Sequence, residues 1–347
     1  MTTIARVIAC LLLILPAVVT SAAPVITSVT PNTSPVAGGI HVTIRGNGFS
    51  LCIICSPPVP PRVSFGLTPA ASVSLIDTQT LDVVTPAHLP GTFSVTVGEF
   101  DGMATATDAF TFSGDPTEAF ERILLPIYLP PVQGAFGSDF VTDFRAFNLS
   151  GDQTLSVFGL GAPMFCYGVI FEPPPFDPLE EPLSIARRDT LECVDRIGDP
   201  GRLLWVPAAM ADSFAANLRV TDVSRSSKTA GVEIPLARSR DFHTAIALLG
   251  VPIDNQGTGF RALLRIYSLE PEPLAVSVTY LGKTVSVQLR PGTDIFDPAY
   301  GTFSEFAGAQ RATMDILIES TDPARHIWAF ATVTNNETQE ITIVSPN

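Results

Sequence analysis

The sequence predicts an all-β protein in which an N-terminal sandwich precedes one or two further β-sandwich units. Apolar and polar residues alternate with a period of two in short runs, for example at 40–44, 72–76 and 93–97. Glycine and proline separate these runs, and no stretch of residues 24–113 has a convincing helical period. The length of 347 residues is enough for two to three domains.

The composition excludes several classes of protein. Charged residues make up only 16% of the chain, and the 20 basic residues are outnumbered by 34 acidic ones, which gives a net charge of −14. Such a chain repels a phosphate backbone, so we expect no nucleic acid among its partners. Hydrophobic residues make up 46%, which is typical of globular domains and not of disordered chains.

Residues 1–23 have the pattern of a secretory signal peptide. Arg6 precedes an apolar run of 13 residues, 7–19, and small residues follow it. The run contains Pro16 and is shorter than the ~20 residues that span a membrane. We therefore expect cleavage near Ala22 or Ala23, no transmembrane segment in the mature chain, and a secreted, periplasmic or cell-surface location.

Cysteine usage agrees with an exported protein. Cys10 leaves with the signal, and four cysteines remain: Cys52, Cys55, Cys166 and Cys193. An even number in an oxidising compartment predicts disulfides. Local pairing of Cys52 with Cys55 and of Cys166 with Cys193 is the simplest of three connectivities.

The C-x-x-C spacing at Cys52 and Cys55 also allows a redox or a metal site. Redox motifs of this kind open a helix, whose N-terminus lowers the pKa of the thiol. The segment 56–61 is S-P-P-V-P-P, which forbids a helix, and no second pair of ligands follows at zinc-site spacing. The spacing therefore favours a structural bridge.

Residues 24–113 resemble the IPT/TIG family of immunoglobulin-like domains. The segment 24–49 contains an I-x-x-V-x-P start, a double glycine at 38–39 and a V-T-I-R-G-N-G-F strand and turn, and G-T-F-S-V-T-V follows at 91–97. The C-I-I-C segment is an insertion relative to the shortest members. The resemblance implies an immunoglobulin-like sandwich that acts as a spacer or binding module and carries no catalytic residues.

The boundary of this domain is expected near residue 115, with a linker at 114–122 in which 117–122 could form a short turn of helix. Residues 123–347 again read as β-rich, with one or two sandwiches that divide near residue 210. The expected strands are 140–148, 153–158, 202–207, 215–223, 229–235, 260–269, 274–280, 284–289, 313–319, 326–334 and 339–345.

A weak internal repeat places Arg145, Arg219 and Arg265 at equivalent positions of three similar strands. A duplicated β unit explains it, and so does the chance similarity of alternating strands.

No motif for a catalytic, cofactor or metal site is present. The histidines, His41, His88, His243 and His326, form no ligand spacing, and the sequence lacks a nucleophile elbow, a phosphate-binding loop and an EF-hand loop. The acidic segment 172–181 could bind calcium, but it reads better as a solvated loop stiffened by proline.

The function predicted from these observations is non-enzymatic binding at the cell surface or outside the cell, with a glycan or a protein as partner and the N-terminal domain as spacer or presenter. The 166–193 loop is the expected contact surface, with Tyr167 and Phe176 as candidate ligand contacts, because binding elements favour loops on rigid scaffolds. Two alternatives remain open: a secreted glycan- or peptide-cleaving hydrolase with an unrecognised active site, and a structural component of the bacterial envelope.

Overall fold

The computed structural model describes residues 23–52, 55, 58–99, 102–126, 132–134, 137–159, 164–167, 182–195, 202–224, 231–252, 254, 259–289 and 313–346. Nearly all regular structure within these ranges is β-strand, which confirms the predicted all-β class. In the same ranges no helix is both long and apolar enough to cross a membrane.

Residues 25–113 form two facing sheets, with strand orders β1-β3-β7-β6 and β2-β9-β8-β4-β5. The strands are β1 (Val25–Thr30), β2 (Thr33–Pro35), β3 (His41–Asn47), β4 (Arg62–Phe65), β5 (Thr68–Pro69), β6 (Ser72–Asp77), β7 (Thr80–Val84), β8 (Gly91–Glu99) and β9 (Gly102–Ser113). Alternate residues point inward, as Phe93, Val95 and Val97 do on β8, and they meet Phe65 and Phe110 in one buried core.

The double glycine has a clear steric role before β3. Gly38 has a φ of +68°, and a Cβ atom there would lie 2.2 Å from the carbonyl oxygen of Pro86. Only glycine therefore fits at the point where the chain turns into the strand.

The linker contains one 3₁₀ turn, η1 (Pro116–Glu118), and β10 (Phe120–Leu125) begins two residues after it. The carboxylate of Asp115 accepts hydrogen bonds from the backbone N–H and the hydroxyl of Thr117, which hold the pKa of Asp115 below its ordinary value. The expected helical turn at 117–122 is wrong in its second half, because Phe120 and the residues after it pair as a strand.

After the linker, the first group of strands ends at residue 238. It comprises β10, β11 (Val132–Gln133), β12 (Asp139–Asn148), β13 (Leu155–Val157), β14 (Met164–Tyr167), β15 (Leu183–Ile185), β16 (Thr190–Asp195), β17 (Arg202–Pro207), β18 (Phe214–Asp222), β19 (Val232–Ile234) and β20 (Ala237–Arg238), with the 3₁₀ turns η3 (Ala208–Ser213) and η4 (Ser239–Asp241) beside them. One sheet has the order β14-β16-β12-β18-β19, and a second has the order β17-β10-β20.

The second group begins at residue 245. It comprises β21 (Ala245–Pro252), β22 (Phe260–Ser268), β23 (Leu274–Tyr280), β24 (Lys283–Leu289), β25 (Thr313–Ser320), β26 (Ile327–Asn335) and β27 (Ile341–Val344). Its sheets have the orders β21-β25-β23-β24 and β22-β26-β27. The β23–β24 hairpin, with Leu281 and Gly282 at its turn, joins the two strands that the sequence predicts at 274–280 and 284–289.

The two groups share one continuous core. Residues 327–334 of β26 are all buried, so both faces of this central strand are covered. Tyr267 stacks on Phe330 with ring centroids 6.4 Å apart, and its hydroxyl donates a hydrogen bond to the carbonyl of Pro126 in the first group. Packing therefore continues from one group into the other.

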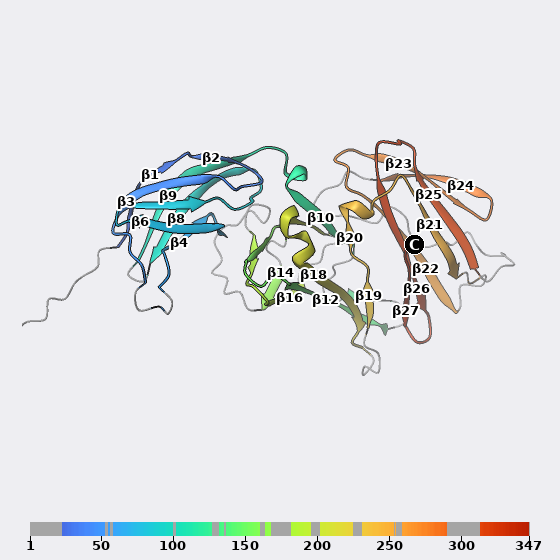
Figure 1. Ribbon diagram of the computed structural model, residues 1–347. Helices are drawn as coiled ribbons and strands as arrows, with labels where there is room; N and C mark the ends of the chain where they lie inside the picture. The colour runs from blue at the N-terminus through green and yellow to red at the C-terminus, as the bar shows by residue number, and fades with distance from the viewer. Residues whose placement is uncertain are drawn as a thin grey trace, which may run out of the picture.

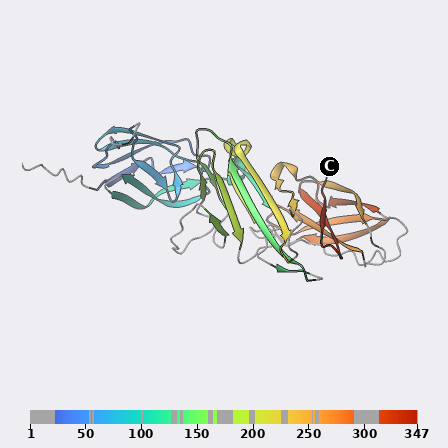
Figure 2. The same cartoon turned by 90° about the horizontal axis from the view of Figure 1, so that it is seen from below.

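A small aromatic cluster joins the N-terminal sandwich to the first group, and the units follow one another along the long axis of the molecule (Figures 1 and 2). Leu89, in the loop between β7 and β8, packs with Phe120 and Phe158. The ring of His88 is buried, and its centroid lies 4.0 Å from the ring centroid of Phe93 and 5.1 Å from that of Phe158.

Burial determines the charge of His88. It lowers the pKa of His88 from 6.5 to about 4, and hydrogen bonds to the backbone of Leu89 and Phe65 offset part of this effect. The ring is therefore neutral in the folded protein near neutral pH, as an aromatic contact between units requires.

We expect His88 to make the free energy of unfolding depend on pH. Between about pH 6.5 and pH 4 the unfolded chain takes up a proton at His88 that the folded chain does not. Stability therefore falls as the pH is lowered through this window, by up to about 3 kcal/mol, and the loss is complete below it. Urea denaturation of the protein and of His88→Gln across this range measures the effect. Equal pH slopes for the two proteins would show that the ring titrates normally.

Candidate functional site

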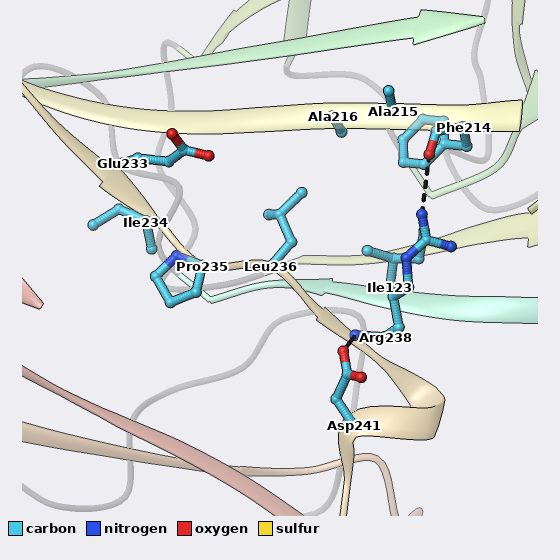
Figure 3. Close-up of a pocket in the computed structure, with 10 residues that line it drawn as sticks. All are labelled: Ile123, Phe214, Ala215, Ala216, Glu233, Ile234, Pro235, Leu236, Arg238 and Asp241. Atoms are coloured by element: carbon cyan, nitrogen blue, oxygen red, sulfur yellow. Dashed lines mark hydrogen bonds between the residues drawn. The ribbon is translucent and has the colours of Figure 1, made fainter. Parts of the chain in front are cut away.

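A pocket of about 460 Å³ opens between β10, β18 and the β19–β20 segment (Figure 3). This volume is within the range of small-ligand sites. Its lining consists of Ile123, Phe214, Ala215, Ala216, Glu233, Ile234, Pro235, Leu236, Arg238 and Asp241. Ile123, Phe214 and Ile234 are nearly fully buried, so they lie behind the pocket and present almost no surface to a ligand.

The pocket exists because one segment leaves its neighbour to pair elsewhere. Residues 232–234 pair with β18, but after Pro235 and Leu236 the chain pairs with Ile123 and Leu124 of β10 as β20. The two sheets separate at this point, and the space between them is the pocket. Proline suits such a point because it has no backbone N–H to offer a further strand.

The guanidinium of Arg238 makes its hydrogen bonds to groups within the protein. Its guanidinium pairs with the carboxylate of Glu121 and donates to the carbonyl oxygens of Ala211, at 3.2 Å, and Phe214, at 3.0 Å. Its backbone N–H donates to the carboxylate of Asp241 at 2.8 Å. These contacts fasten β20 to β10, η3 and β18, so Arg238 is a brace, and one oxygen of the Asp241 carboxylate accepts a hydrogen bond from the backbone of Arg238.

Glu233 is the remaining charged group of the pocket. It is exposed, and no hydrogen bond or ion pair of the described residues involves its carboxylate. It lies opposite Arg219, which lies opposite Asp143 on β12, so the three residues share the outer face of the sheet. Arg145 lies two residues from Asp143 on that face, and the pocket therefore opens beside a surface of mixed charge.

The described lining residues determine which chemical groups the pocket offers to a ligand. Among the described lining residues there is no histidine, serine, threonine or cysteine, and of the two carboxylates Asp241 accepts a backbone hydrogen bond whereas Glu233 has no hydrogen-bond or ion-pair partner in the described part of the chain. The exposed carboxylate of Glu233 is therefore the charged group of the described lining that a ligand can reach.

The structure places two of the four predicted disulfide cysteines in a bond. Cys52 and Cys55 form a disulfide, which is the local pairing expected from the sequence. Cys166 and Cys193 are directly opposed in the pairing of β14 with β16. Their bond stays a prediction that this register favours.

Of the two predicted ligand contacts, Tyr167 lies within the described residues. Tyr167 ends β14 and lies opposite Glu192, in the sheet that also contains β12 and β18. Phe176 and most of the 166–193 loop lie outside the described residues, so their role as a contact surface stays a prediction.

The histidines are dispersed. His41 is exposed and lies 3.1 Å from Asp82, while His243 and His326 are exposed in the second group. In the part of the chain that the structure describes, no group of three or more histidine, cysteine or acidic side chains could hold a metal ion.

Sequence reasoning missed every residue of the pocket. The segment V-E-I-P-L-A-R at 232–238 contains the relevant signal, because proline after three strand residues marks an edge or a change of sheet. The pairing of β20 with β10, more than 110 residues earlier in the chain, has no counterpart in local pattern.

Comparison with known proteins confirms the N-terminal resemblance. Residues 24–113 match the IPT/TIG domain family, over the range predicted from the sequence. No curated protein matches the chain.

Three solved structures share partial similarity. SGBP-B from a complex xyloglucan utilization locus in Bacteroides uniformis is 11% identical, with 93% of this chain and all (100%) of that chain aligned and a TM-score of 0.20. SGBP-B of the mixed-linkage glucan utilization locus of Bacteroides ovatus, in complex with a mixed-linkage heptasaccharide, is 9% identical. The alignment covers 84% of this chain and 70% of that chain, with a TM-score of 0.16. A γ-CGTase of Bacillus clarkii is 17% identical over 62% of this chain, which spans 24% of that enzyme, with a TM-score of 0.23. At these scores the likenesses carry no conclusion about function.

We expect the pocket wall to depend on the pairing of Arg238 with Glu121. Glu121 is only 10% exposed, so Glu121→Gln leaves a partly buried guanidinium without its counter-charge and lowers the free energy of unfolding by about 2–3 kcal/mol. The matched control is Asp212→Asn. Asp212 is 97% exposed and lies 3.9 Å from Arg240, and its loss changes stability little. Equal urea midpoints for the two variants would contradict the bracing role of Arg238.

Proposed function

We propose that the protein is an exported, non-enzymatic binding protein that acts at the cell surface or outside the cell. Its C-terminal β region holds the ligand in the pocket between β10, β18 and the β19–β20 segment. The N-terminal IPT/TIG unit spaces or presents this region. The partner is a glycan or a protein.

The observation that carries the proposal is the chemistry of the pocket lining. The carboxylate of Glu233 is exposed beside Arg238 and Asp241, both of which already make hydrogen bonds within the protein, and this arrangement supports binding of a ligand. A hydrolase would need a second reactive group within reach of Glu233, and in the described lining the other carboxylate, that of Asp241, already accepts a hydrogen bond from the backbone of Arg238.

The role of the IPT/TIG unit as a spacer is supported by its own buried core and its small contact with the next unit through Leu89, Phe120 and Phe158. We further propose that the remainder divides between residues 238 and 245. Strands on either side of residue 210 in the sequence pair with each other, since β10 pairs with β20 and β12 pairs with β18. The next group of strands starts at Ala245.

Export is supported by the pattern of residues 1–23 and by the disulfide between Cys52 and Cys55, since disulfides persist in oxidising compartments. We propose a second bridge between Cys166 and Cys193 and keep Tyr167 and Phe176 as further ligand contacts. Tyr167 belongs to the same sheet as Arg145 and Arg219.

The test is retention of ligands by the purified protein. We expect the immobilised protein to retain a polysaccharide or a protein from solubilised envelope fractions, and Glu233→Arg to reduce retention at least about tenfold by reversing the one uncommitted charge of the pocket. Glu319→Arg is the matched control, because Glu319 is also an exposed glutamate on a strand but lies on β25.

Equal retention by the two variants would move the binding site away from the pocket. Cleavage of a retained polysaccharide or peptide would instead establish the hydrolase alternative. Self-assembly without any retained ligand would establish the structural one.

A further inference from the structure

The backbone of β18 directs successive residues to opposite sides. The carbonyl of Ser213 accepts a hydrogen bond from the N–H of Leu149, which follows β12, at 2.7 Å. The carbonyl of Phe214 accepts one from Arg238 on the pocket side, at 3.0 Å. In an antiparallel strand this alternation continues, so the N–H and C=O of Ala216 both point to the pocket side.

Ala216 is the residue at which β18 loses its neighbour on that side. Leu218 and Val220 lie opposite Ile234 and Val232 of β19. The next position in this register would place Leu236 opposite Ala216, but no pairing or hydrogen bond joins them among the described residues. One N–H and one C=O of a strand edge are therefore offered to the pocket.

These two backbone groups fit one kind of ligand. A residue of an extended peptide presents its own N–H and C=O on one side, at the spacing of Ala216, and can exchange both hydrogen bonds. The N–H and C=O of a sugar acetamido group point in opposite directions from one amide, so such a group reaches only one of the two.

The charge of the pocket selects among peptides. The carboxylate of Glu233 has no partner among the described residues, whereas Arg238 is paired with Glu121. The whole chain has a net charge of −14. A lysine or arginine side chain next to the paired residue would contact Glu233, and an apolar side chain would contact the half-buried Leu236.

We infer that the pocket binds an extended, basic peptide segment of a partner protein, one residue of which pairs with the backbone of Ala216 while a neighbouring cationic side chain contacts Glu233. This inference rests on the proposed binding function and names its ligand class.

The test uses the purified protein and three blocked tripeptides as probes: acetyl-Val-Lys-Val-amide, its glutamate analogue, and the lysine peptide methylated on all its backbone nitrogens. Binding is followed by NMR titration of the Ala216 amide. We expect the lysine peptide to bind, and both the glutamate analogue and the methylated peptide to bind at least about tenfold more weakly.

Three variants distinguish the contribution of the Ala216 backbone from that of the Glu233 charge. Ala216→Pro removes an N–H that points away from β12, so the ladder with β12 is kept, and binding of the lysine peptide, now read by isothermal titration calorimetry, should fall at least about tenfold. Ala216→Ser keeps the N–H and should keep binding. Glu233→Gln should reduce affinity for the lysine peptide to that for the same peptide with norleucine.

Loss of binding in Glu233→Gln and in Ala216→Pro, with retention in Ala216→Ser, supports the inference. Absence of lysine-peptide binding, or equal binding of the methylated peptide, overturns it. If a polysaccharide is retained through Glu233 while no peptide binds, the proposed binding function stands and the peptide inference is wrong. If nothing is retained and no peptide binds, both are wrong.

Discussion

The C-terminal region depends on one constraint: the buried strand β10 needs a pairing partner on each of its two edges. Ile123 and Leu124 are 1% and 0% exposed, so their backbone groups cannot be satisfied by water. β17 pairs with one edge of this strand, and residues 237–238 pair with the other. A buried backbone group without a partner costs about 1–3 kcal/mol, whereas the half-buried edge of β18 at Ala216 can still be hydrated. The chain therefore pairs both edges of β10 and leaves the edge of β18 at Ala216 without a neighbouring strand.

The pairing of residues 237–238 with β10 produces the pocket and also positions the residues around it. The segment 232–238 cannot follow β18 and reach β10 at once, so the sheets separate at Pro235 and Leu236. Arg238 then bridges the separation by binding Glu121 of β10 and the carbonyl of Phe214 on β18. The pairing of Arg238 with Glu121 holds one end of the pocket, and the pairing of β18 with β19 holds the other. The backbone groups of Ala216 and the carboxylate of Glu233 lie between them. β10 also begins with Phe120, which packs toward the IPT/TIG unit, so the same strand positions the N-terminal spacer.

Local pattern predicted much of the fold. Alternation and turns located β12, β17, β18 and the β23–β24 hairpin within one or two residues, and the double glycine with the V-T-I-R-G-N-G-F segment identified the IPT/TIG unit. The pattern failed at β10, where the polar pair Glu121 and Arg122 interrupts the apolar run and conceals a strand. Both side chains serve distant partners: Glu121 pairs with Arg238, and Arg122 donates to the carbonyl of Leu269 at 3.2 Å. The candidate site escaped prediction because it arises from a competition between two strand edges far apart in sequence.

The most direct test of this account is hydrogen exchange at the amides of β18 in the free protein, resolved residue by residue by NMR. We expect the amide of Ala216 to exchange rapidly, while those of Leu218 and Val220, which face β19, are protected together with the core. Protection of Ala216 equal to that of Leu218 would show that Leu236 continues the pairing of β19. In that case the sheets do not separate, and the pocket would lack the open strand edge.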